Sequence, residues 1–251
     1  MTTLLIDGDI LVYRVAHIGT QEGFDGTKYV NEEAVKEYID SLIDYISQRL
    51  FTKKIFIFLS GKSNFRKQLV PTYKENRKKL EKPLALNFTY EYLLNHPHFE
   101  VVKEDLLEAD DLLGLNANKD SVICTIDKDL DQIPGYHYNW KNDEFYVVKP
   151  EEAYKLLWRQ ILSGDAIDGY KGIPGIGKKK ALKLLNSLKK EHEQSFENIE
   201  FWWNQVLKIY EEHDLTEEEA TQNAICAYIL RNNDYNFDTH EIKTPFMEVK
   251  F

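Results

Sequence analysis

Acidic residues at a few points of the chain are its strongest chemical signal. They follow short apolar runs typical of buried strands, or open a helix that comes after such a run. The carboxyl ends of parallel strands line one crevice of a sheet, so we expect these carboxylates to converge there. The acids of this sheet region are Asp7, Glu108, Asp110, Asp111, Asp127 and Asp129.

Carboxylates crowded in this way need a counter-charge. Like charges about 4 Å apart repel by several kcal/mol at an effective dielectric near 20. Oxygen-only ligation favours Mg²⁺ or Mn²⁺, and no Cys/His pair has the spacing of a zinc site. Taken singly, Glu108 or Asp110 could simply favour a helix N-terminus, and Asp7-Gly8 could be a turn. Acidic groups at several element ends are harder to explain in that way, so we predict a metal site.

A glycine-rich stretch, residues 164–177 (GDAIDGYKGIPGIG), precedes three lysines and a helix. Closely spaced glycines let backbone N–H groups approach a phosphate, and a helix start adds its dipole. The lysines add attraction to a nucleic-acid backbone that does not depend on base sequence. Alternatively, Gly175 and Gly177 merely turn the chain between two helices. Asp165 and Asp168 share a face at helical spacing and could extend the acidic cluster to a second metal.

The formal net charge of −10 does not exclude a nucleic-acid partner, because the distribution of charge matters more than its sum. Many of the acids are the candidate ligands just named, whereas basic residues gather in one stretch. That stretch contains Lys62, Arg66, Lys67, Lys74, Arg77, Lys78, Lys79 and Lys82. A basic surface beside an acidic pocket is compatible with phosphate binding.

The composition, 43% hydrophobic and 29% charged over 251 residues, is typical of a soluble globular protein. This length suits one large α/β domain, or a domain with a subdomain. No apolar run reaches the roughly 20 residues of a membrane span, and we expect no secretory signal. The two cysteines are too few for a disulfide framework, so we expect buried free thiols in a cytoplasmic protein.

Strand-like and helix-like segments alternate through the first part of the chain. This alternation predicts an α/β fold with a mainly parallel sheet and helices on both faces. The predicted strands are 4–6, 54–59, 99–102, 121–126, 136–138 and 145–148, and the predicted helices between them are 31–50, 84–94 and 106–116. After residue 150 we predict helices at 151–162, 178–188, 199–210 and 217–230, then a strand-like end at 241–251. Residues 62–82 show weak apolar periodicity, and we expect them to be mobile in the free protein.

The motifs IDGD, EADD, DKDLDQIP and GDAIDGYKGIPGIGKKKA, in this order, resemble the flap-endonuclease superfamily of 5′ nucleases. Their spacing and the tail at 227–237 are most similar to the 5′→3′ DNA exonucleases of short-tailed coliphages. The resemblance extends from about Leu5 to about Ile242. It implies a PIN-like nuclease core at 1–149, with a basic arch at about 61–83. It also implies a helical duplex-binding region at 150–251, with a helix–three-turn–helix at about 160–188.

The resemblance further implies roles for residues at matching motif positions. The six sheet-region acids are similar to ligands of a first metal and its water shell, and Asp165 and Asp168 to ligands of a second. Lys74 and Arg77 match arch residues that would contact the scissile phosphate, and Tyr73 could stack on a base. The residues expected to bind DNA are Arg66, Lys78, Lys79, Gly172, Gly175, Gly177, Lys178, Lys179 and Lys180.

The implied activity is phosphodiester hydrolysis with two Mg²⁺ ions, or Mn²⁺ in their place, at the 5′ ends or flaps of duplex DNA. RNA in an RNA–DNA hybrid is a further implied substrate, and K⁺ is expected at the helix–three-turn–helix. Such an enzyme would act in phage-type DNA replication or host DNA degradation, in the host cytoplasm if phage-encoded. We expect a monomer and no membrane partner.

One position departs from the family pattern, which usually has an aspartate at the end of the second strand. Ser60 occupies that place, so the first metal could bind more weakly. Asp9 could substitute, although we expect it on the opposite side of the strand from Asp7. Two alternatives remain open: a PIN-type ribonuclease, against which the glycine-rich turn argues, and a non-catalytic DNA-binding protein, which Ser60 favours.

Overall fold

The computed structural model describes residues 2–52, 54–79 and 81–251. Met1, Lys53 and Leu80 lie outside the described residues, as do the side chains of Lys78 and Lys79, both predicted to bind DNA. The chain divides into two compact units. The first consists of Met1–Lys62, Leu80–Lys128 and Gly135–Tyr146, and the second of Ser63–Lys79, Asp129–Pro134 and Val147–Phe251. Most of the predicted basic arch therefore groups with the C-terminal part of the chain.

A mainly parallel sheet organises the first unit, as predicted. Among the described residues its strands follow the order β5-β4-β1-β6-β7-β8, and the pairs from β5 to β7 are parallel. The strands are β1 (Thr3–Asp7), β4 (Lys54–Ser60), β5 (Glu100–Glu104), β6 (Ser121–Cys124), β7 (Gly135–Asn139) and β8 (Glu144–Val148). The central β1 and β6 are buried almost throughout, which explains why they are continuous apolar runs in the sequence.

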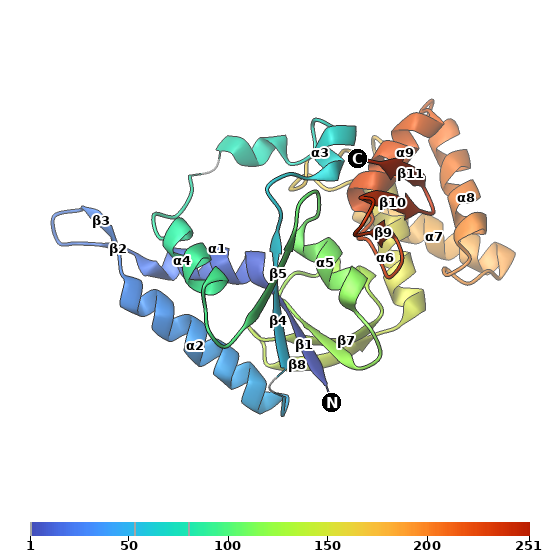
Figure 1. Cartoon of the computed structure of the whole chain (residues 1–251). Helices are drawn as coiled ribbons and strands as arrows, with labels where there is room; N and C mark the ends of the chain where they lie inside the picture. Colours follow the sequence, from blue (N-terminus) through green and yellow to red (C-terminus); the bar gives the residue numbers. More distant parts are fainter. Residues whose placement is uncertain (1, 53, 80) are drawn as a thin grey trace. The chain divides into compact units, whose positions relative to one another are not determined.

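Helices cover both faces of this sheet. Figure 1 shows α1, α2 and α4 gathered on one face and α5 on the other. Their bounds are α1 (Gly8–Gly19), α2 (Glu32–Arg49), α4 (Leu86–Leu94) and α5 (Ala109–Asn116). Helix α2 buries Val35, Ile39, Ile43 and Ile46, the stripe that predicted it, and the Asn31 side chain caps its first turn.

Helix α1 was not predicted from the sequence. It begins directly after β1, and the Asp7 carboxylate caps it by accepting a hydrogen bond from Ile10 N–H at 3.1 Å. Gly8 is required there, because a Cβ would lie 2.5 Å from the carbonyl oxygen of Phe58. A hairpin of β2 (Thr20–Glu22) and β3 (Lys28–Val30) follows α1.

The second unit is mainly helical, as predicted for the region after residue 150. Its large buried side chains include Trp158, Trp202 and Tyr210. The predicted strand-like end forms the antiparallel strands β10 and β11 rather than one extended strand. The elements are α6 (Pro150–Ser163), α7 (Lys178–His192), α8 (Ile199–Glu211), α9 (Glu217–Ala227), β9 (Tyr235–Asn236), β10 (Glu241–Thr244), β11 (Met247–Lys250), α3 (Phe65–Leu69) and the 3₁₀ turns η1 (Glu75–Lys79) and η2 (Asp129–Gln132).

The basic segment contains more core than its sequence suggested. Phe65, Val70 and Tyr73 are buried, although residues 62–82 have weak apolar periodicity. Isolated apolar residues on short turns leave no periodic signal, which explains the difference. Both cysteines are buried free thiols, as predicted. No helix in the described part of the chain is long and apolar enough to cross a membrane.

Candidate active site

Asp7, at the end of β1, is fully buried. Its carboxylate accepts hydrogen bonds from Thr125 Oγ1 at 2.8 Å and from Ile10 N–H at 3.1 Å. Burial, together with the charges of Asp9 and Asp127, raises the pKa of Asp7 to about 7, against the lowering effect of the two hydrogen bonds. The excess of negative charge around Asp7 would be relieved by a cation.

Asp9 lies close enough to Asp7 to perturb it, so the predicted placement on the opposite side of a strand is wrong. The strand ends at Asp7, and Asp9 belongs to the first turn of α1. Its carboxylate accepts hydrogen bonds from the backbone N–H of Ser60, at 3.1 Å, and from the Ser60 hydroxyl. Ser60 Oγ in turn accepts from Ala109 N–H at 3.1 Å. Ser60 therefore links Asp9 to the N-terminus of α5.

The three acids around the start of α5 have different environments. Asp111 is fully buried and accepts a hydrogen bond from the backbone N–H of Glu108 at 3.2 Å. Glu108 and Asp110 are half-buried. Helix α5 begins with a capping box in which Glu108 is the N-cap residue and Asp111 is its reciprocal partner, so the helix-capping interpretation is confirmed for Glu108. A cap does not preclude a second role for this residue.

The acids that follow β6 fall in different units. Asp127 belongs to the first unit, and its N–H donates to Thr125 Oγ1 at 3.0 Å. Asp129 belongs to the second unit and accepts a hydrogen bond from Gln160 Nε2 at 2.9 Å. Within the described residues, no three carboxylate, imidazole or thiol side chains gather closely enough to form a complete metal site.

Asp165 and Asp168 lie in a turn after α6, not on a helix as their spacing suggested. Asp165 Oδ1 accepts from the N–H groups of Ile167, at 2.8 Å, and Asp168, at 3.4 Å. Its main chain pairs with Tyr170 in an isolated antiparallel bridge. Asp165 is 7% exposed, and its Oδ2 lies 3.5 Å from Lys178 Nζ. The turn brings both carboxylates toward the basic residues of the second unit.

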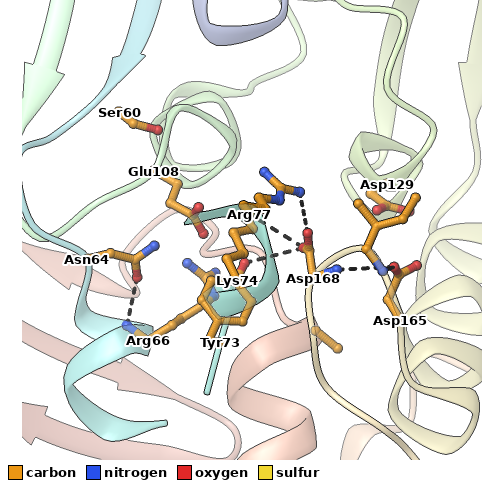
Figure 2. A network of polar contacts seen from close by, with 12 residues as sticks. Ser60, Asn64, Arg66, Tyr73, Lys74, Arg77, Glu108, Asp129, Asp165 and Asp168 are labelled. Atoms are coloured by element: carbon orange, nitrogen blue, oxygen red, sulfur yellow. Dashed lines mark hydrogen bonds and ion pairs between the residues drawn. The ribbon is translucent and has the colours of Figure 1, made fainter. Parts of the chain in front are cut away.

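The predicted arch residues Tyr73, Lys74 and Arg77 converge on Asp168 (Figure 2). Lys74 Nζ lies 3.7 Å from Asp168 Oδ2, Arg77 forms an ion pair with Oδ1, and the Tyr73 hydroxyl donates to Oδ2 at 3.4 Å. The backbone N–H of Lys74 also donates to the carbonyl of Asp168, at 2.8 Å. Tyr73 is only 3% exposed, so its ring offers no free face for the predicted base stacking.

Arg66 was predicted to bind DNA, and its placement in the structure contradicts that prediction. It is 2% exposed and its guanidinium lies over the Phe65 ring. Nε donates to the carbonyl of Ile225 at 3.1 Å, and Nη2 to that of Tyr228 at 2.5 Å. The Arg66 guanidinium thus connects α3 to the end of α9 by hydrogen bonds and does not face solvent.

In the glycine-rich turn between α6 and α7, the backbone at Gly172 lies close to that at Gly164, whereas the glycines nearer α7 are surrounded by open space. Gly164 and Gly172 have φ values of 64° and 60°, and a Cβ on Gly172 would lie 2.2 Å from Gly164 N. Gly175, with φ 77°, and Gly177 would have nothing within 4 Å of a Cβ. The following Lys178, Lys179 and Lys180 are exposed on the first turn of α7. An open glycine turn before a lysine-bearing helix start is suited to phosphate.

Two supporting residues were missed from the sequence. Thr125 is buried and holds both Asp7 and Asp127. Asn76 lies between Lys74 and Arg77, and its amide donates to two carbonyls of the Asp165–Asp168 turn. Asn76 could have been singled out from the sequence because it lies inside the basic motif.

Comparisons with known proteins agree with the fold. The family model described as "5'-3' exonuclease, N-terminal resolvase-like domain" matches residues 2–156. An exonuclease of Escherichia phage T7 is 30% identical over 217 residues, covering 75% of this chain and 72% of that protein. An exodeoxyribonuclease of Enterobacteria phage T3 is 26% identical over 283 aligned positions, covering 95% of this chain and 91% of that protein.

Solved structures also match nearly the whole chain. A T5 5′-exonuclease with bound zinc has a TM-score of 0.64 at 18% identity, covering 91% of each chain. The bacteriophage T5 D15 flap endonuclease, in a complex with DNA and metal ions, has a TM-score of 0.60 at 18% identity, covering 90% of this chain and 89% of that chain. At this identity the likeness demonstrates the fold alone.

Proposed function

Because the chain belongs to the 5′–3′ exonuclease family, we propose that it hydrolyses DNA phosphodiester bonds at the 5′ end or flap of a duplex with divalent metal ions. The observation that carries this proposal is the convergence of Lys74 and Arg77 on Asp168 in the second unit. Asp168 holds these two cations side by side, and a pair of neighbouring cations would stabilise the charge on a transferring phosphoryl group.

The chemistry of the donor set fits divalent metal ions. Asp7 is buried, and its pKa is raised by that burial and by acidic neighbours, which is an environment that favours a cation. All candidate ligands are carboxylates, which suit Mg²⁺ or Mn²⁺. Bound ions would lower the pKa of the attacking water and stabilise charge on the attacked phosphate. We assign the first ion to Asp7, Glu108, Asp110, Asp111, Asp127 and Asp129, and the second to Asp165 and Asp168.

Lys74 and Arg77 differ in exposure, and we assign them different roles. The Lys74 side chain is 10% exposed, whereas that of Arg77 is 46% exposed. A cation shielded from water interacts more strongly with a nearby negative charge. Lys74 would therefore stabilise charge that develops on the scissile phosphate, and Arg77 would meet the incoming phosphate first. Neither role requires a nucleophile from the protein.

Duplex DNA would dock through its phosphates on the glycine-rich turn and α7. The open Gly175 and Gly177 and the exposed lysines 178–180 support this assignment. Gly172 would shape the turn, and Lys78 and Lys79 would add contacts from η1. Binding of this kind selects structure rather than base sequence. We further propose a helix–three-turn–helix with K⁺ on its carbonyls, cleavage of RNA in RNA–DNA hybrids, and action as a cytoplasmic monomer.

The proposed two-ion assignment is tested with Asp127→Ala and Asp168→Ala, one for each set of ligands. Labelled 5′-flap duplex is incubated with each variant in Mg²⁺ and in EDTA, with Lys67→Ala as an exposed basic control. We expect wild type and control to cut in Mg²⁺ alone, and the two carboxylate variants to lose cleavage. Turnover by either variant at the wild-type rate would overturn the assignment.

The same assay separates the alternatives. Binding of flap DNA without cleavage by the wild type would favour the non-catalytic protein, and preferential cutting of single-stranded RNA would favour the ribonuclease. Lys74→Ala should slow single-turnover cleavage while leaving the affinity for the duplex nearly unchanged. A loss confined to affinity would contradict the role of Lys74 in charge stabilisation.

A further inference from the structure

The tip of the turn between Asp165 and Asp168 has little side-chain packing of its own. Ile167, at its tip, is 69% exposed, and the following Gly169 has no side chain. Gly169 has φ 78°, a left-handed conformation that favours glycine. The position of Asp168 therefore depends on hydrogen bonds to the turn and on the ion pairs of its carboxylate with Lys74 and Arg77.

The exposed Asn76 supplies hydrogen bonds of this kind. Its Nδ2 donates to the carbonyl of Ala166 at 3.0 Å and to that of Ile167 at 3.2 Å. On the inner side of the turn, Asp165 Oδ1 accepts from Ile167 N–H at 2.8 Å. The peptide groups before Asp168 are thus held on both their donor and acceptor sides.

The segment that carries Asn76 runs directly against the turn. The N–H of Lys74 donates to the carbonyl of Asp168 at 2.8 Å. A Cβ on Gly169 would lie 3.2 Å from the carbonyl oxygen of Thr72 and 3.6 Å from Asn76 Oδ1. The Lys74 backbone hydrogen bond and the Asn76 amide therefore hold the main chain of the acidic turn against the basic segment, beside the side-chain contacts that Tyr73, Lys74 and Arg77 make with Asp168.

We propose that Asn76 is a positioning residue that holds the 165–168 turn in register with Lys74 and Arg77. Through these hydrogen bonds it keeps Asp168 beside the two cations, where the carboxylate would serve as a ligand of the proposed second metal ion. The inference rests on the proposed function, since Asp168 is the group that Asn76 positions. Small displacements of a reacting group are costly, because about 1 Å can change a rate on the order of 100-fold.

The test compares two substitutions of similar volume. Asn76→Leu keeps the approximate shape but removes the amide donor, whereas Asn76→Gln keeps a donor on a longer side chain. Asn95→Leu is the matched control, since Asn95 is also exposed and its Nδ2 donates to the Glu91 carbonyl at 2.8 Å, in the first unit. Each variant is measured for single-turnover cleavage of flap DNA, for duplex affinity, and for calorimetric Mn²⁺ binding without DNA.

We expect Asn76→Leu to cut roughly 10-fold more slowly, to bind the duplex within about twofold of wild type, and to bind one Mn²⁺ several-fold more weakly. Asn76→Gln should recover part of both losses, and the control should match wild type. Wild-type rate and Mn²⁺ binding by Asn76→Leu would overturn the proposal, as would losses that Asn76→Gln does not reduce. A wild-type protein that fails to cut flap DNA in Mg²⁺ would instead refute the proposed function.

Discussion

Replacement of the buried Arg66 by methionine should destabilise the second unit without weakening the affinity of the protein for duplex DNA. The guanidinium donates to the carbonyls of Ile225 and Tyr228, and hydrogen bonds from charged groups contribute about 1.5–3 kcal/mol each. Methionine retains much of the packing of the arginine stem but leaves two carbonyls without these donors. Part of the loss is offset because a buried charge no longer has to be desolvated. We expect a net loss of about 2–4 kcal/mol in the free energy of unfolding.

Urea unfolding followed by tryptophan fluorescence measures this loss, because Trp158 and Trp202 are buried in the second unit. Lys67→Met, an exposed change on the same short helix, is the control and should leave the midpoint unchanged. Duplex affinity is measured in parallel at several salt concentrations. A lost phosphate contact would reduce the salt dependence of log K by about 0.9. Unchanged stability of Arg66→Met together with such a reduction would refute the structural role of Arg66.

Three further predictions follow from the carboxylates and the glycine turn. Burial raises the pKa of Asp7 to about 7, so the metal-free protein should lose stability as pH rises from about 4 to 7. Asp7→Asn should remove that pH-dependent loss and raise the free energy of unfolding at pH 8 by roughly 2–4 kcal/mol, as measured by urea titration. The same variant should abolish cleavage. A stability profile of Asp7→Asn with the wild-type pH dependence would contradict this prediction. Ser60→Asp places a second carboxylate beside Asp9, so the variant should have a lower melting temperature without metal and should recover in Mg²⁺. Equal melting temperatures of the variant and the wild type in EDTA would count against this prediction. Gly172→Ala should cost more than about 3 kcal/mol because of its 2.2 Å Cβ contact, whereas Gly175→Ala should cost about 1 kcal/mol. Circular dichroism melts in which Gly175→Ala is less stable than Gly172→Ala would refute the close backbone approach of Gly172 to Gly164.

The sheet and most helices could be predicted because their apolar residues recur with a clear period. Helix α2 buries residues three and four apart, and β1 and β6 are continuous apolar runs. Helix α1 was missed because Asp7 both ends a strand and caps the next helix, so no loop separates the two elements. Without a turn signal between them, the sequence does not indicate where the hydrophobic period changes from that of a strand to that of a helix.

The site was predictable in its residue types but not in its contacts. Asp168, Lys74 and Arg77 were identified from motifs, and the structure brings them together. The burial of Arg66 and Tyr73 could not be predicted, since the carbonyls that hold Arg66 lie 159 and 162 positions further along the chain. Local spacing carries no information about partners at that separation.

The assembly of the second unit from three stretches of chain has a consequence for its synthesis. Residues 63–79 leave the ribosome long before Ile225 and Tyr228, the partners of Arg66. At about 5–20 residues per second, this delay lasts roughly 8–30 s. Throughout that interval Arg66 lacks these partners, so the core around Phe65 is incomplete. We expect the flanking basic side chains to act as gatekeepers against aggregation, so residues proposed to bind DNA would also protect the nascent chain.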